Sequence, residues 1–307
     1  MSNNQVHVSK YLEFCQEQKR LDAKTLKAYE IDLRQFSEYL AEFSITSLSI
    51  ETLEDYLSKL HQKYKPRTVK RKIASIKAFF HYLEYKKIID YNPVDKIYLK
   101  FREPVLLPKV IPLHTVEILL STVYKRYYSA RTEYQKKNIL RDVAVLELLF
   151  ATGMRISELC SLRPDNVDLE NGTVLIYGKG AKERRIQIGN PGVLCILREY
   201  QTIFAEESIK CESFFINHVG NALLDQSVRR MINKYTEVAS VELHITPHMF
   251  RHTFATSLLE ADVDIRYIQE MLGHSSISVT QIYTHVSLSK QRDILTTKHP
   301  RNSFNLL

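Results

Sequence analysis

The sequence has no apolar run close to the roughly 20 residues that a membrane-spanning helix needs. Its first residues, Met1–Lys10, are polar and contain no apolar core of a signal peptide, so we expect a cytoplasmic protein with no membrane partner. The G-x-x-x-x-G-K-[ST] motif of nucleotide-binding phosphate loops is absent as well. These absences argue against membrane proteins, secreted proteins and enzymes that hydrolyse nucleotides through such a loop.

Cysteine is scarce, and its spacing fits neither a disulfide framework nor a metal cluster. The four cysteines are Cys15, Cys160, Cys195 and Cys211, and none belongs to a C-x-x-C pair. Most of them have apolar neighbours in the sequence, as in Leu194-Cys195-Ile196. We therefore expect buried free thiols in a reducing compartment.

The 307 residues are enough for two domains, and 44% of them are hydrophobic, so the chain should fold around ordinary cores. The formal net charge is +8. A basic chain of this size suggests a polyanionic partner, and nucleic acid is the leading candidate.

The first hundred residues show the apolar periodicity of a helical bundle. Asp22 can cap the second helix, a third begins near Ser49, and Pro66 is a suitable first-turn residue for the fourth. The apolar side of the fourth helix comprises Val69, Ile73, Ile76, Phe80 and Leu83.

The same fourth helix carries a cluster of basic residues that no acidic residue interrupts. Its members are Lys65, Arg67, Lys70, Arg71, Lys72 and Lys77. The cluster is either an ordinary solvated face or a surface that grips DNA phosphates. The unbroken positive charge favours the phosphate-binding interpretation for Lys65, Arg67, Lys70, Arg71 and Lys77.

Three prolines between residues 100 and 112 indicate an extended linker. We therefore predict a helical domain over 1–103, a linker over 104–112 and a second domain over 113–307. The second domain is again mostly helical, with an apolar helix that ends at Gly153. Two strand-like runs, 172–177 and 184–188, predict a β-hairpin with a basic tip. The predicted fold class is mainly α, with one small β-hairpin or sheet.

The second domain also contains the groups that phosphoryl transfer requires. His248 and Arg251 are three residues apart and so share one helical face. His274 follows a glycine, and Tyr283 lies nine residues further on. Arg155 follows the helix that ends at Gly153, and Lys179 lies on the hairpin tip. Arginine and histidine can stabilise charge on phosphate oxygens, while tyrosine can act as the nucleophile.

Each of these residues alone has an ordinary explanation, such as a surface charge or a packed ring. His248 and His252 also form an H-x-x-x-H pair that could hold zinc. Met249 replaces the glutamate of the H-E-x-x-H motif, however, and no third ligand follows at metal spacing. We therefore expect no metal and interpret His252 as a structural neighbour of the site.

Four motifs resemble the tyrosine recombinases, and among them the Xer-like bacterial integrases. They are Thr152-Gly-Met-Arg-Ile-Ser-Glu-Leu159, Tyr177-Gly-Lys-Gly-Ala-Lys-Glu-Arg184, Pro247-His-Met-Phe-Arg-His-Thr-Phe-Ala-Thr256, and Ile268–Ser275 running into Tyr283-Thr-His-Val286. The resemblance covers nearly the whole chain. It implies a helical, SAM-like core-binding domain followed by a catalytic domain, which together close on DNA.

The resemblance also implies a role for each matching residue. It makes Arg155, His248 and Arg251 the set that holds the scissile phosphate, and His274 the second histidine. Lys179 resembles the hairpin lysine that protonates the leaving 5′ oxygen, and Glu158 an acidic residue that orients the cluster. Tyr283 resembles the nucleophile that forms a 3′-phosphotyrosine. No cofactor, metal or ATP is expected, because the phosphotyrosine retains the energy of the broken ester.

The implied partner is double-stranded DNA with an inverted-repeat recombination site. Family members act as homo- or hetero-tetramers on two duplexes, in some cases with accessory proteins, and a C-terminal helix docks on the neighbouring protomer. The alternatives are a type IB topoisomerase-like relaxase and a DNA-binding relative without activity. An insertion-like run over 123–137 leaves open whether the chain resolves chromosome dimers or serves a mobile element.

Overall fold

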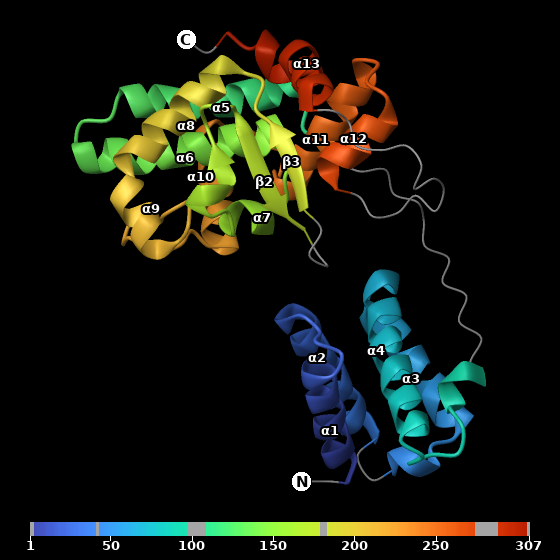
Figure 1. Ribbon diagram of the computed structural model, residues 1–307. Helices are drawn as coiled ribbons and strands as arrows, with labels where there is room; N and C mark the ends of the chain where they lie inside the picture. Colours follow the sequence, from blue (N-terminus) through green and yellow to red (C-terminus); the bar gives the residue numbers. More distant parts are fainter. Residues whose placement is uncertain (1–2, 41–42, 97–108, 179–182, 274–287, 306–307) are drawn as a thin grey trace. The chain divides into compact units, whose positions relative to one another are not determined.

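The computed structural model describes residues 3–40, 43–96, 109–178, 183–273 and 288–305 (Figure 1). The chain divides into two compact units, residues 1–106 and 107–307, each with its own hydrophobic core. Most of the predicted linker, and the catalytic candidates Lys179, His274 and Tyr283, lie outside the described residues. No described helix is both long and apolar enough to cross a bilayer.

The N-terminal unit is a bundle of four helices: α1 (Asn3–Glu17), α2 (Ala23–Leu40), α3 (Ile50–Lys63) and α4 (Pro66–Tyr85). Two short 3-10 helices, η1 (Ile45–Ser47) and η2 (Pro93–Lys96), join or follow them. The Asp22 carboxylate accepts from the backbone N of Thr25 at 2.9 Å, as predicted for a cap. The third helix begins near Ser49 as predicted, and the Ser49 side chain caps it. All five predicted apolar residues of α4, from Val69 to Leu83, are buried.

The C-terminal unit surrounds its core with helices. They are α5 (Leu113–Tyr128), α6 (Glu133–Thr152), α7 (Ile156–Cys160), α8 (Pro191–Ile203), α9 (Ala205–Cys211), α10 (Asp225–Val238), α11 (Pro247–Glu260), α12 (Ile265–Leu272) and α13 (Leu288–Lys298). Two 3-10 helices, η3 (Pro164–Asn166) and η4 (Pro300–Ser303), complete the described elements. Residues Leu140 to Thr152 of α6 are nearly all buried, which makes this helix the centre of the unit.

A three-stranded antiparallel sheet covers one side of these helices (Figure 1). Its strands β1 (Val167–Asp168), β2 (Thr173–Tyr177) and β3 (Glu183–Gln187) lie in sequence order. The predicted hairpin is therefore present, with Ile176 opposite Arg184, and a short third strand extends it. The mainly helical fold class with one small sheet is confirmed.

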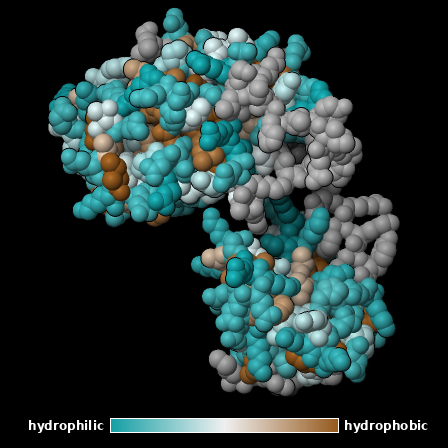
Figure 2. All heavy atoms as spheres, viewed as in Figure 1, coloured by the Kyte–Doolittle hydropathy of each residue, from teal (hydrophilic) through white to brown (hydrophobic). Residues whose placement is uncertain are grey.

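The surface drawn in Figure 2 is mostly hydrophilic, with hydrophobic side chains in small scattered groups. All four cysteines are free, as predicted. Burial is confirmed for Cys15 only, since Cys160 and Cys211 are partly exposed and Cys195 is exposed. Successive residues of a helix point about 100° apart, so the apolar neighbours Leu194 and Ile196 face inward without taking Cys195 with them.

The C-terminal segment packs on its own unit. Ile294 and Leu295 of α13 are buried, and so are His299 and Arg301. The neutral ring of His299 donates from Nε2 to the Phe150 carbonyl at 2.9 Å and accepts at Nδ1 from the Arg301 backbone. A Cβ on Gly189 would lie 2.7 Å from the backbone of Leu295, so the segment crosses the end of β3 at very close range.

Candidate active site

Arg155 is placed by the turn between α6 and α7. Gly153 ends α6 in the left-handed conformation, with φ of +60°, and Arg155 caps the N-terminus of α7 two residues later. Glu158, in the first turn of α7, accepts from the Arg155 backbone N at 2.8 Å and from its Nη1 at 2.8 Å. The local sequence therefore holds one arginine and one carboxylate against each other.

Arg251 and His248 lie in the first turns of α11, as their spacing predicts. Arg251 is buried, with 6% of its surface exposed. Its Nη1 donates to the Gly153 carbonyl at 3.0 Å and its Nη2 to the Leu272 carbonyl at 2.6 Å. Arg251 thus joins the end of α6 to the end of α12, and its backbone partners place it beside Arg155.

A third arginine, Arg184 on β3, belongs to the same cluster although it was not among the predicted site residues. Its Nη2 donates to Glu158 Oε2 at 2.7 Å, and its Nε donates to the Met271 carbonyl at 2.8 Å. The strand pattern contained a signal for it. Arg184 is two residues from the buried Ile186, so the alternation of the strand places it on the inward face.

The cluster has a strongly positive electrostatic environment. Burial lowers the pKa of Arg251 to about 10, and repulsion by Arg155 and Arg184 acts in the same direction. Burial also lowers the pKa of His248, assisted by the charges of Arg229, Arg251 and Arg155. Burial alone would raise the pKa of Glu158, but hydrogen bonds from Arg184 and Arg155 lower it to about 2. Two guanidinium groups thus share one ionised carboxylate, and the charge of a third, Arg251, also interacts with it. The excess positive charge suits a phosphate ligand.

The same charges bear on the zinc alternative. His252 lies one turn after His248 on α11. Burial lowers the pKa of His252, and the charges of His248 and Arg251 lower it further. A divalent cation at this histidine pair would be repelled by the arginines that already depress the pKa of His248. The surroundings therefore disfavour the zinc interpretation.

The three remaining candidates can be placed only by their neighbours in the sequence. Lys179 falls between β2 and β3, whose ends Tyr177 and Glu183 pair directly with each other. His274 directly follows Gly273, which ends α12 beside the carbonyls that Arg184 and Arg251 hold. Tyr283 falls between α12 and α13.

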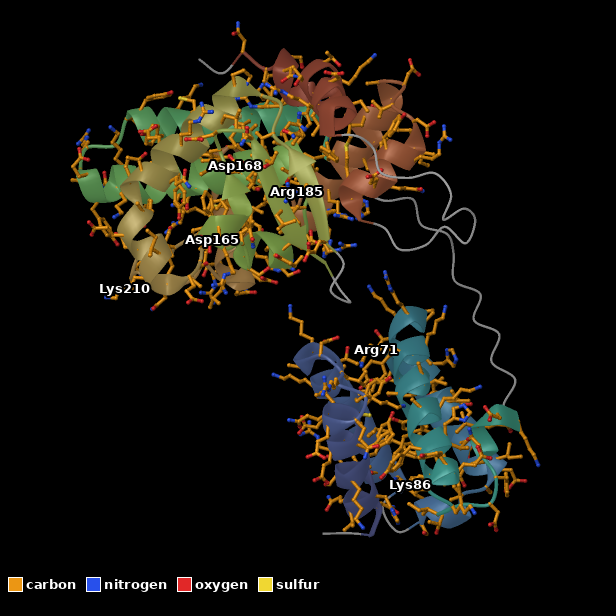
Figure 3. The ribbon with its side chains drawn as sticks, viewed as in Figure 1. Arg71, Lys86, Asp165, Asp168, Arg185 and Lys210 are labelled. Atoms are coloured by element: carbon orange, nitrogen blue, oxygen red, sulfur yellow. The ribbon has the colours of Figure 1, made fainter. Side chains whose placement is uncertain are left out.

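The predicted DNA-binding residues of α4 differ in their surroundings. Lys65, Arg67, Lys70, Arg71 and Lys77 are all exposed. Arg71, labelled in Figure 3, nevertheless donates to the buried Asp32 of α2. Lys77 pairs with Asp95 at 2.8 Å. Carboxylates from other elements therefore reach a basic face that looks uninterrupted in the sequence.

Including Lys72 in the basic surface of α4 was wrong. Its side chain is 3% exposed, and its Nζ donates to Asp32 at 2.9 Å and to Gln35 at 2.5 Å. The ammonium also lies 4.9 Å from the centre of the Tyr64 ring. Lys72 compensates the buried charge of Asp32 and so belongs to the interior of the bundle.

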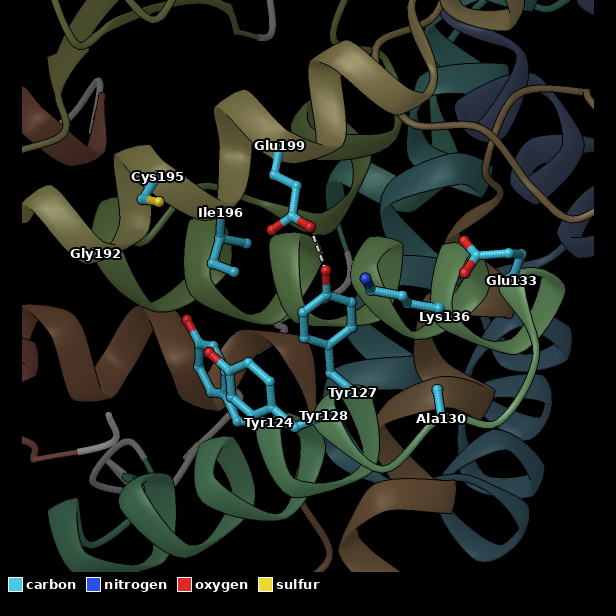
Figure 4. Close-up of a pocket in the computed structure, with 10 residues that line it drawn as sticks. All are labelled: Tyr124, Tyr127, Tyr128, Ala130, Glu133, Lys136, Gly192, Cys195, Ile196 and Glu199. Atoms are coloured by element: carbon cyan, nitrogen blue, oxygen red, sulfur yellow. Dashed lines mark hydrogen bonds between the residues drawn. The ribbon is translucent and has the colours of Figure 1, made fainter.

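The insertion-like run 123–137 forms the end of α5, the turn after it and the start of α6. With α8 it borders a hollow of about 470 Å³, shown in Figure 4. The lining residues are Tyr124, Tyr127, Tyr128, Ala130, Glu133, Lys136, Gly192, Cys195, Ile196 and Glu199. Tyr127 donates a hydrogen bond to Glu199 across it. Arg155, Glu158, His248 and Arg251, the candidate catalytic residues that the structure describes, do not line this hollow, so it is separate from the arginine cluster.

Two family models match the chain: the Phage integrase family over residues 117–290, and the Phage integrase N-terminal SAM-like domain over residues 8–87. A tyrosine recombinase of Agathobacter rectalis is 62% identical over 305 residues, covering 99% of this chain and 100% of the relative. The chain belongs to the phage integrase family of tyrosine recombinases. It is therefore a site-specific recombinase, an enzyme that cuts and rejoins DNA strands, as the sequence predicted.

More distant relatives support the same assignment. The tyrosine recombinase XerD of Listeria innocua is 36% identical over 303 residues, with 96% of this chain and 98% of the relative covered. XerC of Bacillus subtilis is 33% identical over 314 residues, with 98% of each covered. The fold is similar to that of the XerH recombinase bound to a palindromic difH substrate. That likeness has a TM-score of 0.70 at 23% identity and covers 96% of this chain and 82% of that one. These relatives do not favour the topoisomerase-like or inactive alternatives.

Proposed function

We propose that the arginine cluster of the C-terminal unit is the active site of the recombinase and that Tyr283 is its nucleophile. The observation that carries the proposal is the pairing of Arg155 and Arg184 with the carboxylate of Glu158, together with the buried charge of Arg251, which interacts with all three groups. Such an excess of fixed positive charge stabilises the charge that develops on the non-bridging oxygens of a phosphate under attack.

Arg155 and Arg251 act differently within this site. Arg155 keeps 36% of its side chain exposed and can direct N–H groups toward a phosphate. Arg251 is buried and fixed to two backbone carbonyls, so it supplies a rigid positive charge beside Arg155. The lowered pKa of His248 keeps its ring neutral near pH 7, so the ring can accept a proton.

The reaction we propose exchanges one phosphate ester bond for another, so the number of ester bonds stays the same. The Tyr283 oxygen forms a bond to the scissile phosphorus, and the bond from phosphorus to the 5′ oxygen breaks. The tyrosine proton passes to a base in the site, and Lys179 gives its proton to the departing 5′ oxygen. Attack by a 5′ hydroxyl on the 3′-phosphotyrosine reverses these steps and rejoins the strand. His274 would be a further donor to the phosphate.

The partner we propose is double-stranded DNA with an inverted-repeat site, bound by four protomers that hold two duplexes. Related folds have been solved on DNA, among them a lambda integrase tetramer on a Holliday junction, with a TM-score of 0.67 at 16% identity. Lys65, Arg67 and Lys70 on α4 would contact phosphates, with Arg71 and Lys77 beside them. The compartment we propose is the cytoplasm, because the bacterial DNA lies there.

Covalent trapping on a nicked duplex tests this proposal. A target duplex is first selected from a random library by its binding to the wild-type chain. We expect wild-type protein to form an adduct that denaturing electrophoresis retains, and Tyr283→Phe to form none while it binds the duplex with nearly unchanged affinity. An adduct formed by Tyr283→Phe would refute the nucleophile assignment.

Two further measurements separate the roles within the site. Arg155→Ala should lower the rate of adduct formation by about 100-fold or more, as expected when a charge that stabilises the transition state is removed. Adduct formation should also continue in EDTA. A loss that added zinc restores would instead support the histidine-pair metal site.

A further inference from the structure

Arg184 on β3 makes three hydrogen bonds to two separate parts of the C-terminal unit. Its Nη1 and Nη2 donate to the two oxygens of Glu158 at 3.0 Å and 2.7 Å. Its Nε donates to the Met271 carbonyl at 2.8 Å. Every nitrogen of the guanidinium group therefore has a partner inside the protein.

The exposure of Arg184 differs from that of the arginine proposed to bind phosphate. The Arg184 side chain is 9% exposed, whereas that of Arg155 is 36% exposed. Both donate to Glu158, so one carboxylate is shared between an inner and an outer arginine. The inner one is held by the protein, and the outer one has donors left for a ligand.

The second connection of Arg184 is to the end of α12. Arg184 holds the Met271 carbonyl, and Arg251 holds the carbonyl of the next residue, Leu272, at 2.6 Å. The last carbonyls of a helix have no partner within it, and cations there interact favourably with the helix dipole. The helix ends at Gly273, and the next residue is His274.

We propose that Arg184 is a positioning residue. It orients Arg155 through Glu158 and also fixes the end of α12, the helix that precedes His274, so that these parts form one rigid assembly. This role rests on the proposed active site and adds to it a residue that does not itself contact DNA. Positioning of this kind has a large effect on rate, because a displacement of 1 Å can cost about 100-fold.

The electrostatics of Glu158 give this role a distinctive signature. Its carboxylate accepts hydrogen bonds from Arg184 on β3 and from Arg155 at the start of α7, and it interacts with the charge of Arg251 on α11. Hydrogen bonds from Arg184 are the largest influence that lowers the pKa of Glu158 against the effect of burial. Without Arg184 the pKa of Glu158 should therefore rise, and a protonated carboxyl would hold Arg155 less firmly.

Single-turnover cleavage of the selected nicked duplex between pH 5.5 and pH 9, combined with measurement of Kd, tests the proposal. We expect Arg184→Ala to lower the rate by about 100-fold at pH 8 and to lower it further toward pH 5.5, with Kd changed less than about threefold. Arg184→Lys should restore only part of the rate, because an ammonium group cannot donate to both oxygens of Glu158.

Arg185→Ala is the matched control. Arg185 is the next residue on β3, is exposed and appears in Figure 3, so its loss removes the same charge from the same strand. We expect this variant to cleave like the wild type. The double variant Glu158→Gln/Arg184→Ala should lose less rate than the product of the two single losses, since the two residues act together.

Three results would overturn the proposal: wild-type rates for Arg184→Ala, a rate loss explained entirely by weaker binding, or a loss with an unchanged pH profile. If Arg184→Ala does not fold, the partial rate and pH profile of Arg184→Lys decide the matter. Arg155→Ala tests the active site independently. If Arg155→Ala cleaves normally, the active-site proposal fails. If Arg155→Ala is inactive while Arg184→Ala cleaves normally, only the positioning role of Arg184 is refuted.

Discussion

Arg301 and Glu147 form a buried ion pair that joins residues 154 positions apart in the chain. The Arg301 Nη2 donates to Glu147 Oε1 at 2.8 Å, and its Nε lies 3.0 Å from both carboxylate oxygens. Tyr124 adds a third donor at 2.8 Å. The pair fixes the C-terminal segment to the central helix α6.

Removing one member of this pair should destabilise the C-terminal unit strongly. We expect Arg301→Met to lower the free energy of unfolding by roughly 3–5 kcal/mol, because Glu147 then remains charged and buried without its cation. Urea unfolding of the full chain, followed by circular dichroism, measures the change. The double variant Glu147→Gln/Arg301→Met should recover much of the loss. A double variant less stable than Arg301→Met would contradict this account.

The burial of His299 predicts a specific loss of stability in acid. Burial lowers its pKa to about 4 in the folded chain, against an ordinary value of 6.5. The unfolded chain therefore binds a proton first as the pH falls, and stability should decrease between about pH 6.5 and pH 4. The expected loss is about 3 kcal/mol for this group. His299→Gln cannot titrate, so its unfolding free energy should vary less over this interval, and an identical pH dependence would refute the assignment.

Two cations on α4 should respond differently to substitution. Arg67 is exposed, so Arg67→Ala should weaken DNA binding at low salt and reduce the slope of log K against log salt by about 0.9, the effect of one phosphate contact. Lys72 is buried against Asp32. Lys72→Met should leave that slope unchanged and lower the unfolding free energy by about 1.5–3 kcal/mol. Equal salt slopes for wild type and Arg67→Ala would remove Arg67 from the interface.

These two residues show what local sequence can and cannot predict. Helix ends were predictable because Ser49, Pro66 and Gly153 start or end the helix directly beside them in the sequence. The contrast between Arg67 and Lys72 depends on Asp32, which is 40 residues away from Lys72 in the sequence and lies on another helix. No pattern within α4 alone shows which of its basic residues pairs with Asp32.

The proposed active site divides in the same way. The spacing that places His248 beside Arg251 was visible because it is set by a single turn of helix. Glu158, which lies beside Arg155, was predicted through the resemblance to tyrosine recombinases. Arg184 joins the cluster from a strand and was missed, although its alternation with Ile186 indicated an inward direction. Contacts between elements decide its role, and those depend on the tertiary fold.

The close passage of the C-terminal segment over Gly189 makes the attachment of that segment depend on the absence of a single side chain. A Cβ at Gly189 would lie 2.7 Å from the backbone of both Leu295 and Thr296. Backbone atoms cannot move aside as the end of a flexible side chain can. Any other residue at position 189 would therefore displace the segment from the unit on which it packs.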